Sequence, residues 1–202
     1  LLGRAQRWLD DLRQQDVGPG QVVALEGDYS PNACALMLAL IELQAVVVPL
    51  TRAVRMHRDD FLETAEAQLI VDFDDSDGWT FSRLEAAVTN PLTRSLIDRR
   101  IPGLVVFSSG STGKNKAVLH DFLALLEKYK VVRHRRTTLT FLLLDHLGGI
   151  NTLLYTLSNG GTVVSVQSRD PEVICKAIAN HKVQNLPTSP TFLNMLLISE
   201  IY

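Results

Sequence analysis

A run of hydroxyl and glycine residues, SSGSTGKNK, spans positions 108 to 116 and follows the short apolar run GLVVF. Glycines allow a backbone to approach a ligand closely and to adopt positive φ. Neighbouring backbone N–H groups can then converge on phosphate oxygens. Hydroxyl side chains add further donors, and a lysine supplies a compact positive charge. The stretch therefore has the parts of a phosphate-binding loop, although its composition alone is equally compatible with a plain polar turn.

Two common phosphate-binding patterns do not fit this stretch. A Walker P-loop needs a glycine where Ser108 stands, and it needs a hydroxyl residue where Asn115 follows Lys114. The glycine spacing of a dinucleotide-binding fingerprint is also absent. If the loop binds phosphate, it belongs to another class of site.

The bulk composition is that of a soluble globular protein, with 46% hydrophobic and 21% charged residues in 202. This length suffices for one large domain or two small ones. The net charge of −2 argues against bulk binding of nucleic acid or membranes. No apolar run approaches the roughly 18 residues of a membrane span, so we expect none. The start of the chain carries charges throughout, which does not fit a secretory signal.

The two cysteines, Cys34 and Cys175, stand far apart in apolar surroundings and match no metal-binding or redox spacing. We expect both thiols to be buried and reduced, which fits a cytoplasmic protein. The first residue is Leu1 rather than methionine. We therefore expect the sequence to be an excerpt of a longer chain.

One basic cluster, KYKVVRHRR, covers residues 128–136. It fits a solvated helix end and loop, and it also fits a surface for a phosphorylated partner. One short cluster does not decide between the two interpretations.

Apolar runs alternate with helix signals along the whole chain. Strands are expected at 22–26, 45–50 and 69–73, and a buried helix is expected at 31–44, opened by a serine cap and a proline. After an irregular stretch at 74–101 the alternation continues, with further strands expected at 103–107, 116–119, 138–144, 162–167 and 183–186. Further helices are expected near 2–16, 58–67, 121–130, 148–158, 170–181 and from 189 onward.

This alternation indicates an α/β fold with layered parallel sheets and helices on both faces. We expect two α/β halves, at 1–100 and 101–202, with the hydroxyl-glycine loop in the second.

The stretch VVFSSGSTGKNKAVLHD resembles the phosphate-binding signature of the adenylate-forming superfamily. This superfamily comprises the acyl-CoA synthetases, the adenylation domains of peptide synthetases and the luciferases. Its usual pattern is Thr-Ser-Gly-Thr-Thr-Gly-x-Pro-Lys-Gly-Val. Lys116 falls on the pattern's lysine, while Asn115 and Ala117 replace the usual proline and glycine. The residues that match with conservative exchanges are Ser108, Ser109, Gly110, Ser111, Thr112 and Gly113.

Three further stretches resemble blocks of the same superfamily, in the same order. They are VGPGQVVALEGDYSPNACALMLALIELQAVVVPL, LLLDHLGGINTLLYTLSNGGTVV and NLPTSPTFLNMLL. Together they cover nearly the whole chain and imply the N-terminal part of the superfamily's large domain.

The resemblance implies an ATP-dependent ligase that converts a carboxylic acid and ATP into acyl-AMP and pyrophosphate. The acyl group would then pass to a thiol, most simply that of coenzyme A, with Mg²⁺ assisting at the phosphates. The superfamily's adenine loop, ribose-binding aspartate and C-terminal lysine do not occur in this sequence. We therefore expect these residues alone to be inactive.

The resemblance also implies roles for individual residues. The loop from Ser108 to Gly113, together with a catalytic Lys116, would hold the β and γ phosphates of ATP and stabilise the departing pyrophosphate. His146 would be the second catalytic residue, at the mouth of the acyl pocket, although a histidine packed at a strand end is the structural alternative. Gly148 and Gly149 would leave space near this pocket, or serve only close packing.

Leu147 bears on the choice of substrate. Members that activate amino acids typically have an aspartate at this position, which pairs with the substrate's ammonium. A leucine leaves that ammonium unpaired at a cost of several kcal/mol. The resemblance therefore implies a carboxylic acid without an α-amino group.

Three alternatives remain open from the sequence. The protein could load the phosphopantetheine arm of an acyl carrier protein instead of coenzyme A. It could be a degenerate module that binds nucleotide without turnover, for which Asn115 and Ala117 are weak hints. It could also be an α/β interaction domain without a ligand.

Overall fold

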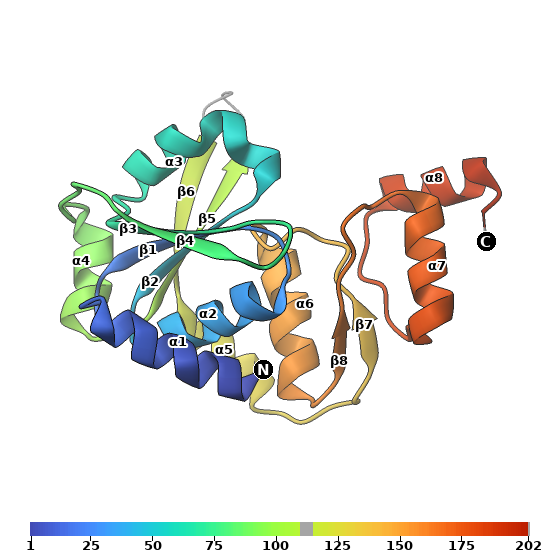
Figure 1. Cartoon of the computed structure of the whole chain (residues 1–202), viewed down its shortest axis with the longest axis horizontal. Helices are drawn as coiled ribbons and strands as arrows, with labels where there is room; N and C mark the ends of the chain where they lie inside the picture. Colours follow the sequence, from blue (N-terminus) through green and yellow to red (C-terminus); the bar gives the residue numbers. More distant parts are fainter. Residues whose placement is uncertain (110–114, 202) are drawn as a thin grey trace. The chain divides into compact units, whose positions relative to one another are not determined.

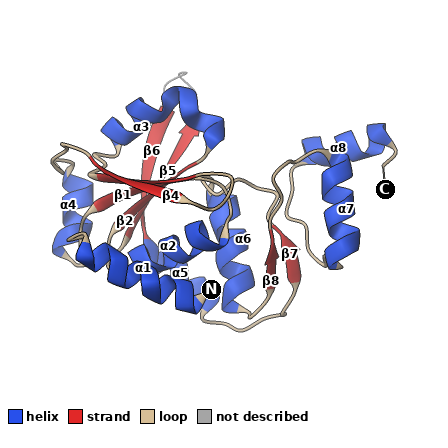
Figure 2. Ribbon diagram, in the orientation of Figure 1, coloured by secondary structure: helices blue, strands red, loops and turns tan. Residues whose placement is uncertain are grey.

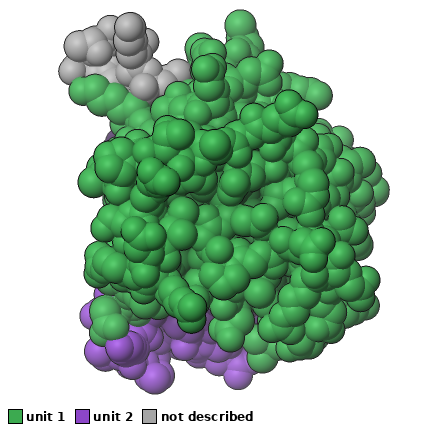
Figure 3. Space-filling view, turned by 90° about the vertical axis from the view of Figure 1, so that its left-hand side faces the viewer, with its two compact units in different colours: residues 1–127 green, residues 128–202 purple. Residues whose placement is uncertain are grey.

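The computed structural model describes residues 1–109 and 115–201. The chain forms two compact units, Leu1–Glu127 and Lys128–Tyr202, which Figure 3 shows in green and purple. The sequence placed a division near residue 100. The compact units divide later because the strands after residue 102 pair with the sheet of the first unit.

In the described part of the first unit, six strands form one sheet in the order β4-β3-β1-β2-β5-β6 (Figure 1). The four inner strands run parallel to one another, whereas β4 and β6 are antiparallel to their neighbours at the two edges. The strands are β1 (Val22–Glu26), β2 (Val46–Leu50), β3 (Leu69–Phe73), β4 (Trp79–Arg83), β5 (Gly103–Ser109) and β6 (Asn115–Asp121).

Every residue of β1 and β2 is buried, as expected for central parallel strands covered on both faces. Alternate residues of a strand face opposite sides of the sheet. Val22 and Val46 belong to one buried cluster with Phe61 of α3 (Arg58–Thr64). The long buried helix α2 (Pro31–Glu42) contacts the same strands from the other side and carries α1 (Leu2–Gln14) on its outer surface (Figure 1). The expected α/β fold with helices on both faces of the sheet is confirmed.

Local capping explains where the helices begin. The side chain of Ser30 accepts the backbone N–H of Ala33 at 2.9 Å, and Pro31 occupies the first helical position of α2. Asp121 caps α5 (Phe122–Leu126) in the same way, at 3.0 Å from the backbone nitrogen of Ala124. Two short 3₁₀ helices complete the first unit and its boundary: η1 (Arg52–His57) and η2 (Glu127–Tyr129).

The stretch at 74–101, expected to be irregular, contains strand β4 and helix α4 (Pro91–Asp98). β4 forms a hairpin with β3, and its residues are largely exposed, so it lacks the apolar run of the inner strands. α4 is short, but its start is marked by Asn90, whose side chain accepts the backbone N–H of Leu92.

The second unit holds the parallel pair β7 (Thr137–Leu139) and β8 (Thr162–Val164) (Figure 2). Its helices are α6 (Leu147–Ser158), α7 (Pro171–His181) and α8 (Pro190–Ser199). The strands expected at 138–144 and 162–167 are shorter than predicted, because their pairing covers three residues. The strand expected at 183–186 is reduced to a single bridge between Thr138 and Asn185.

The two cysteines differ in exposure. Cys34 is buried in α2, as expected, whereas Cys175 is partly exposed and donates its S–H to the backbone oxygen of Ile201 at 3.1 Å. Neither forms a disulfide. Within the described ranges, no helix is both long enough and apolar enough to cross a membrane.

Candidate functional site

The hydroxyl-glycine loop is framed by the β5–β6 hairpin of the first unit. Antiparallel pairing places Ser108 directly opposite Lys116, and Ser109 opposite Asn115. Ser108 and Lys116 are exposed. The structure thus brings together the two ends of the predicted loop. The predicted residues between them, Gly110, Ser111, Thr112 and Gly113, lie outside the described residues.

An aromatic stack fixes β5 against α3 immediately before the loop. The rings of Phe107 and Phe61 are nearly parallel, at 3°, with centroids 3.9 Å apart. Because side chains alternate along a strand, Ser108 and its partner Lys116 point to the opposite side of the hairpin from Phe107. Among the described residues Lys116 forms no ion pair.

Asn115 explains one departure from the superfamily pattern. A proline has no backbone N–H and fits poorly inside a strand pair. Asn115 retains this group and extends the antiparallel pairing by one residue, opposite Ser109. Asn115 is therefore compatible with the strand pair, in which the next residue, Lys116, lies opposite Ser108.

The predicted acyl-pocket residues lie together at the start of α6, in the second unit. His146 occupies the N-cap position, where its side chain makes no capping hydrogen bond and is 60% exposed. Its Nε2 lies 3.8 Å from Oδ1 of the buried Asp145. Leu147 is the first residue of the helix and is partly buried. The exposed imidazole is therefore free to meet a ligand, and it is not packed at a strand end.

The two glycines that follow have a structural role that the sequence left open. A Cβ added to Gly148 would lie 3.0 Å from Cδ1 of Leu142, which is a tight contact. Gly149 is buried within the helix. Close packing accounts for Gly148, whether or not the space also serves a ligand.

A cavity of about 370 Å³ opens beside α6, within the second unit. This volume falls within the usual range of ligand pockets, about 300–1,000 Å³. Residues from three separate segments line it: Lys128, Tyr129, Arg133, Asn151, Thr152, Tyr155, Asn185 and Pro187. The sequence singled out 128–136 as a basic cluster, but it did not identify the α6 residues. A sequence feature that could have identified them is the four-residue spacing of Leu147, Asn151 and Tyr155, which places these residues on one face of a helix.

Hydrogen bonds organise the wall of this α6 cavity. The oxygen Oδ1 of Asn151 accepts from Lys128 Nζ at 2.6 Å and from the Tyr129 hydroxyl at 2.7 Å. Burial raises the pKa of Tyr129 to about 12, so its phenol stays neutral at physiological pH. The Lys128 ammonium also lies 5.1 Å from the centre of the Tyr129 ring.

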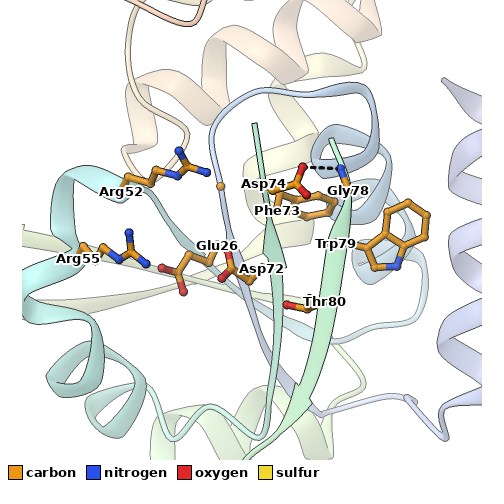
Figure 4. Close-up of a pocket in the computed structure, with 10 residues that line it drawn as sticks. Glu26, Arg52, Arg55, Asp72, Phe73, Asp74, Gly78, Trp79 and Thr80 are labelled. Carbon is orange, nitrogen blue, oxygen red and sulfur yellow. Dashed lines mark hydrogen bonds between the residues drawn. The ribbon is translucent and has the colours of Figure 1, made fainter. Parts of the chain in front are cut away.

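A smaller cavity of about 180 Å³ lies at the carboxyl ends of β1 and β3 in the first unit (Figure 4). Charges line it, but several are compensated within the protein. Glu26 accepts from Arg58 at 2.5 Å, and Arg52 lies 2.7 Å from Asp75. The hydrogen bond to Glu26 raises the pKa of Arg58. In its volume and its charge balance, this cavity is a weaker ligand site than the α6 cavity.

For the expected Mg²⁺, residues 1–109 and 115–201 provide no cluster of metal-binding side chains. No group of three or more His, Cys, Asp or Glu side chains there could hold a metal ion. These residues do not fit a resident metal centre.

Comparisons with known proteins were made over the whole chain. The family model described as AMP-binding enzyme matches residues 4–201. A 4-coumarate–CoA ligase-like protein 9 of Arabidopsis thaliana is 29% identical over 129 residues, which are 59% of this chain and 23% of that protein. A dimodular nonribosomal peptide synthase of Bacillus subtilis is 23% identical over 214 residues, which are 94% of this chain and 9% of that protein.

Among solved structures, the N-terminal domain of FACL13 from Mycobacterium tuberculosis has the same fold, with a TM-score of 0.74 and 21% identity. The match covers 96% of this chain and 56% of that one. The chain thus spans less than a quarter of the two curated relatives.

Proposed function

The chain belongs to the AMP-binding enzyme family, and from this premise we propose that the protein activates a carboxylic acid with ATP and transfers the acyl group to a thiol. In the first step a carboxylate oxygen attacks the α-phosphorus of ATP. The bond from that phosphorus to the bridging oxygen breaks, and pyrophosphate leaves with the electron pair. In the second step a thiolate attacks the acyl carbonyl carbon, and AMP leaves.

The loop from Ser108 to Gly113 would hold the outer phosphates, and Lys116 would neutralise charge that builds on the leaving pyrophosphate. Fixed donors aimed at developing charge are usually the largest single contribution to catalysis. The observation that carries this assignment is the β5–β6 pairing, which holds Lys116 opposite Ser108 with both side chains exposed. Any Mg²⁺ would arrive with the phosphates of ATP.

His146 would meet the acid at the start of α6, either donating a hydrogen bond to its carboxylate or lining the pocket wall. Leu147, next to it, provides no counter-charge for an α-ammonium group. The substrate is therefore a carboxylic acid without an α-amino group.

Two acceptor thiols are compatible with the family. One relative is named as a CoA ligase-like protein and another as a peptide synthase, at 29% and 23% identity. We favour coenzyme A, because Leu147 departs from the pattern of amino-acid-activating members. Transfer to a carrier protein's phosphopantetheine arm is the second candidate. Release of AMP on addition of either thiol to the preformed acyl-adenylate distinguishes them.

The test of the proposed function is pyrophosphate exchange by the full-length protein, measured with a panel of carboxylic acids. We expect exchange that depends on the acid and falls about 100-fold or more in Lys116→Ala, the usual loss for one oxyanion donor. Lys176→Ala is the control, because Lys176 is an exposed lysine paired only with Glu172 along α7. Absence of exchange with every acid, alongside an ATP-induced thermal shift, would identify a binding module without turnover.

We further propose that residues 1–202 alone do not complete the reaction. Each of these relatives is much longer than the part that matches this chain. The same exchange assay on the isolated segment checks this, and robust exchange by the segment would overturn it.

A further inference from the structure

The α6 cavity lies along the helix that starts at the predicted acyl mouth. Asn151 and Tyr155 follow Leu147 by four and eight residues, so the three side chains share one face of α6. With a helical rise of 1.5 Å per residue, these positions lie about 6 and about 12 Å beyond Leu147. We take this face as the path by which an acid bound near Leu147 reaches the cavity.

The cavity wall is largely apolar, and it carries positive charge. Lys128 and Arg133 line it together with two tyrosines and two asparagines, and no carboxylate is among its described lining residues. The Lys128 ammonium is bonded to the neutral amide of Asn151, and no carboxylate among the described residues pairs with it. The Arg133 backbone N–H is bonded to the Asn159 side chain, which positions this part of the basic segment beside α6.

This lining selects against two kinds of acid. An acid with an unsubstituted alkyl chain would contact the apolar part of the wall but would leave the charges of Lys128 and Arg133 without a partner. A distal ammonium group would be repelled by Lys128 and Arg133. A distal carboxylate instead gains charge-assisted hydrogen bonds from both cations.

We propose that the α6 cavity binds a second carboxylate of the substrate, so that the activated acid is a dicarboxylic acid. Its two carboxylates lie about 6–12 Å apart, as the spacing of Leu147, Asn151 and Tyr155 along α6 requires. This inference rests on the proposed function, because it assumes that the first carboxylate is activated at His146. It also gives the basic segment at 128–136 a role beyond that of a solvated loop.

The experiment uses the full-length protein and a series of unbranched α,ω-dicarboxylic acids from glutaric to sebacic acid. Each is paired with the monocarboxylic acid of equal chain length, and pyrophosphate exchange gives kcat/KM. We expect the best dicarboxylic acid to exceed its monocarboxylic counterpart by about tenfold or more, the gain from one charge-assisted contact. An advantage for the monocarboxylic acid at every length would overturn the inference.

Charge reversal at the cavity wall gives a second, independent arm. In Arg133→Glu we expect KM for the best dicarboxylic acid to rise about tenfold or more while KM for ATP is unchanged. The ω-amino acid of matching length should gain activity in the same variant. Arg135→Glu is the control, because Arg135 is exposed in the same segment but does not line the cavity. Unfolding curves of both variants report whether either change disturbs the fold.

The outcomes separate the two proposals. Exchange with monocarboxylic acids only, unaffected by Arg133→Glu, contradicts the dicarboxylic substrate but leaves acid activation intact. No exchange with any acid contradicts the proposed function itself.

Discussion

The side chain of His146 is exposed and contributes little to the stability of the helix that follows it. Its side chain makes no capping bond, so His146→Ala should change the free energy of unfolding by less than about 0.5 kcal/mol. We expect kcat/KM for the acid to fall about tenfold or more, because one hydrogen bond to a charged group is lost. Urea unfolding and pyrophosphate exchange measure the two effects separately.

His146→Phe is the informative partner variant. Superfamily members carry His or an aromatic residue at this position, so a phenylalanine should restore most of the activity if His146 lines the pocket wall. An unchanged rate in His146→Ala would contradict both roles.

Cys34 links stability to alkaline pH. Burial raises the pKa of its thiol from 9.0 to about 12. The unfolded chain therefore loses the proton first, and the contribution of Cys34 to stability, fully present below pH 9, is lost as pH rises towards 12. Above pH 9 we expect the wild type to lose about 1.4 kcal/mol per pH unit relative to Cys34→Ala. Denaturant titrations of both proteins at pH 8 and pH 10 measure this difference. If the free energy of unfolding changed equally with pH in the two proteins, the prediction would be contradicted.

At the scale of single residues, the sequence predicted the chemical pattern of the loop, but it did not predict the environment of each side chain. Lys116 could be selected over Lys114 only by the resemblance, and the strand register then placed it opposite Ser108. The exposure of His146 was not predictable, because it depends on where the chain leaves the short β7–β8 pair. The sequence did not identify Asn151 as a site residue. Its role depends on its hydrogen-bond partners Lys128 and Tyr129, which are distant in the sequence.

At the scale of elements, the stack between Phe61 and Phe107 joins α3 to the hairpin that carries the loop. We expect Phe61→Ala to lower the free energy of unfolding by about 3–5 kcal/mol, because Phe61 is 4% exposed and its loss opens a cavity. A double-mutant cycle with Phe107→Leu should give a coupling energy of about 0.5–1.5 kcal/mol. Urea titrations of the four proteins measure both quantities.

A variant that keeps apolar volume serves as the control. Phe61→Leu retains the burial but not the ring contact, so it should lose less stability than Phe61→Ala. A zero coupling energy in the cycle would show that the stack does not join the two elements.

The elements that could be predicted are those with strong local signals. The inner strands β1, β2 and β3 are β-branched apolar runs, and α2 begins at Ser30-Pro31. The edge strand β4 was not predicted, because its exposed residues do not form an apolar run. Helix α4 was not predicted either, although Asn90-Pro91 is a typical helix start. The apolar run at 138–144 was read as one strand, but the parallel pair ends at Leu139, because tertiary pairing decides where a strand stops.

At the scale of the molecule, the basic segment at 128–136 begins the second compact unit, and residues 130–136 are exposed. We expect trypsin to cleave first within 130–136, because exposed basic residues in a segment without helix or strand are accessible without unfolding. Two fragments, near residues 1–130 and 137–202, should persist in a short digestion followed by mass spectrometry.

Replacing Arg133, Arg135 and Arg136 by glutamine should slow this first cut while leaving the unfolding curve unchanged. A first cut inside the first unit instead, for example after the exposed Arg55, would contradict the division of the chain after Glu127.

The whole candidate site could not be assembled from the sequence. The α6 cavity draws its lining from 128–133, 151–155 and 185–187, segments that sequence spacing does not bring together. The family blocks gave the order of elements along the chain, but they did not give the charge of the surface that these segments form.

The β5–β6 hairpin also has a consequence for protein engineering. The pairing fixes Ser109 opposite Asn115 and Ser108 opposite Lys116. A one-residue insertion inside β6 would turn Lys116 to the other face, since strand side chains alternate. Engineering of this region should therefore preserve the length of β6, because the side on which the Lys116 charge is displayed depends on it.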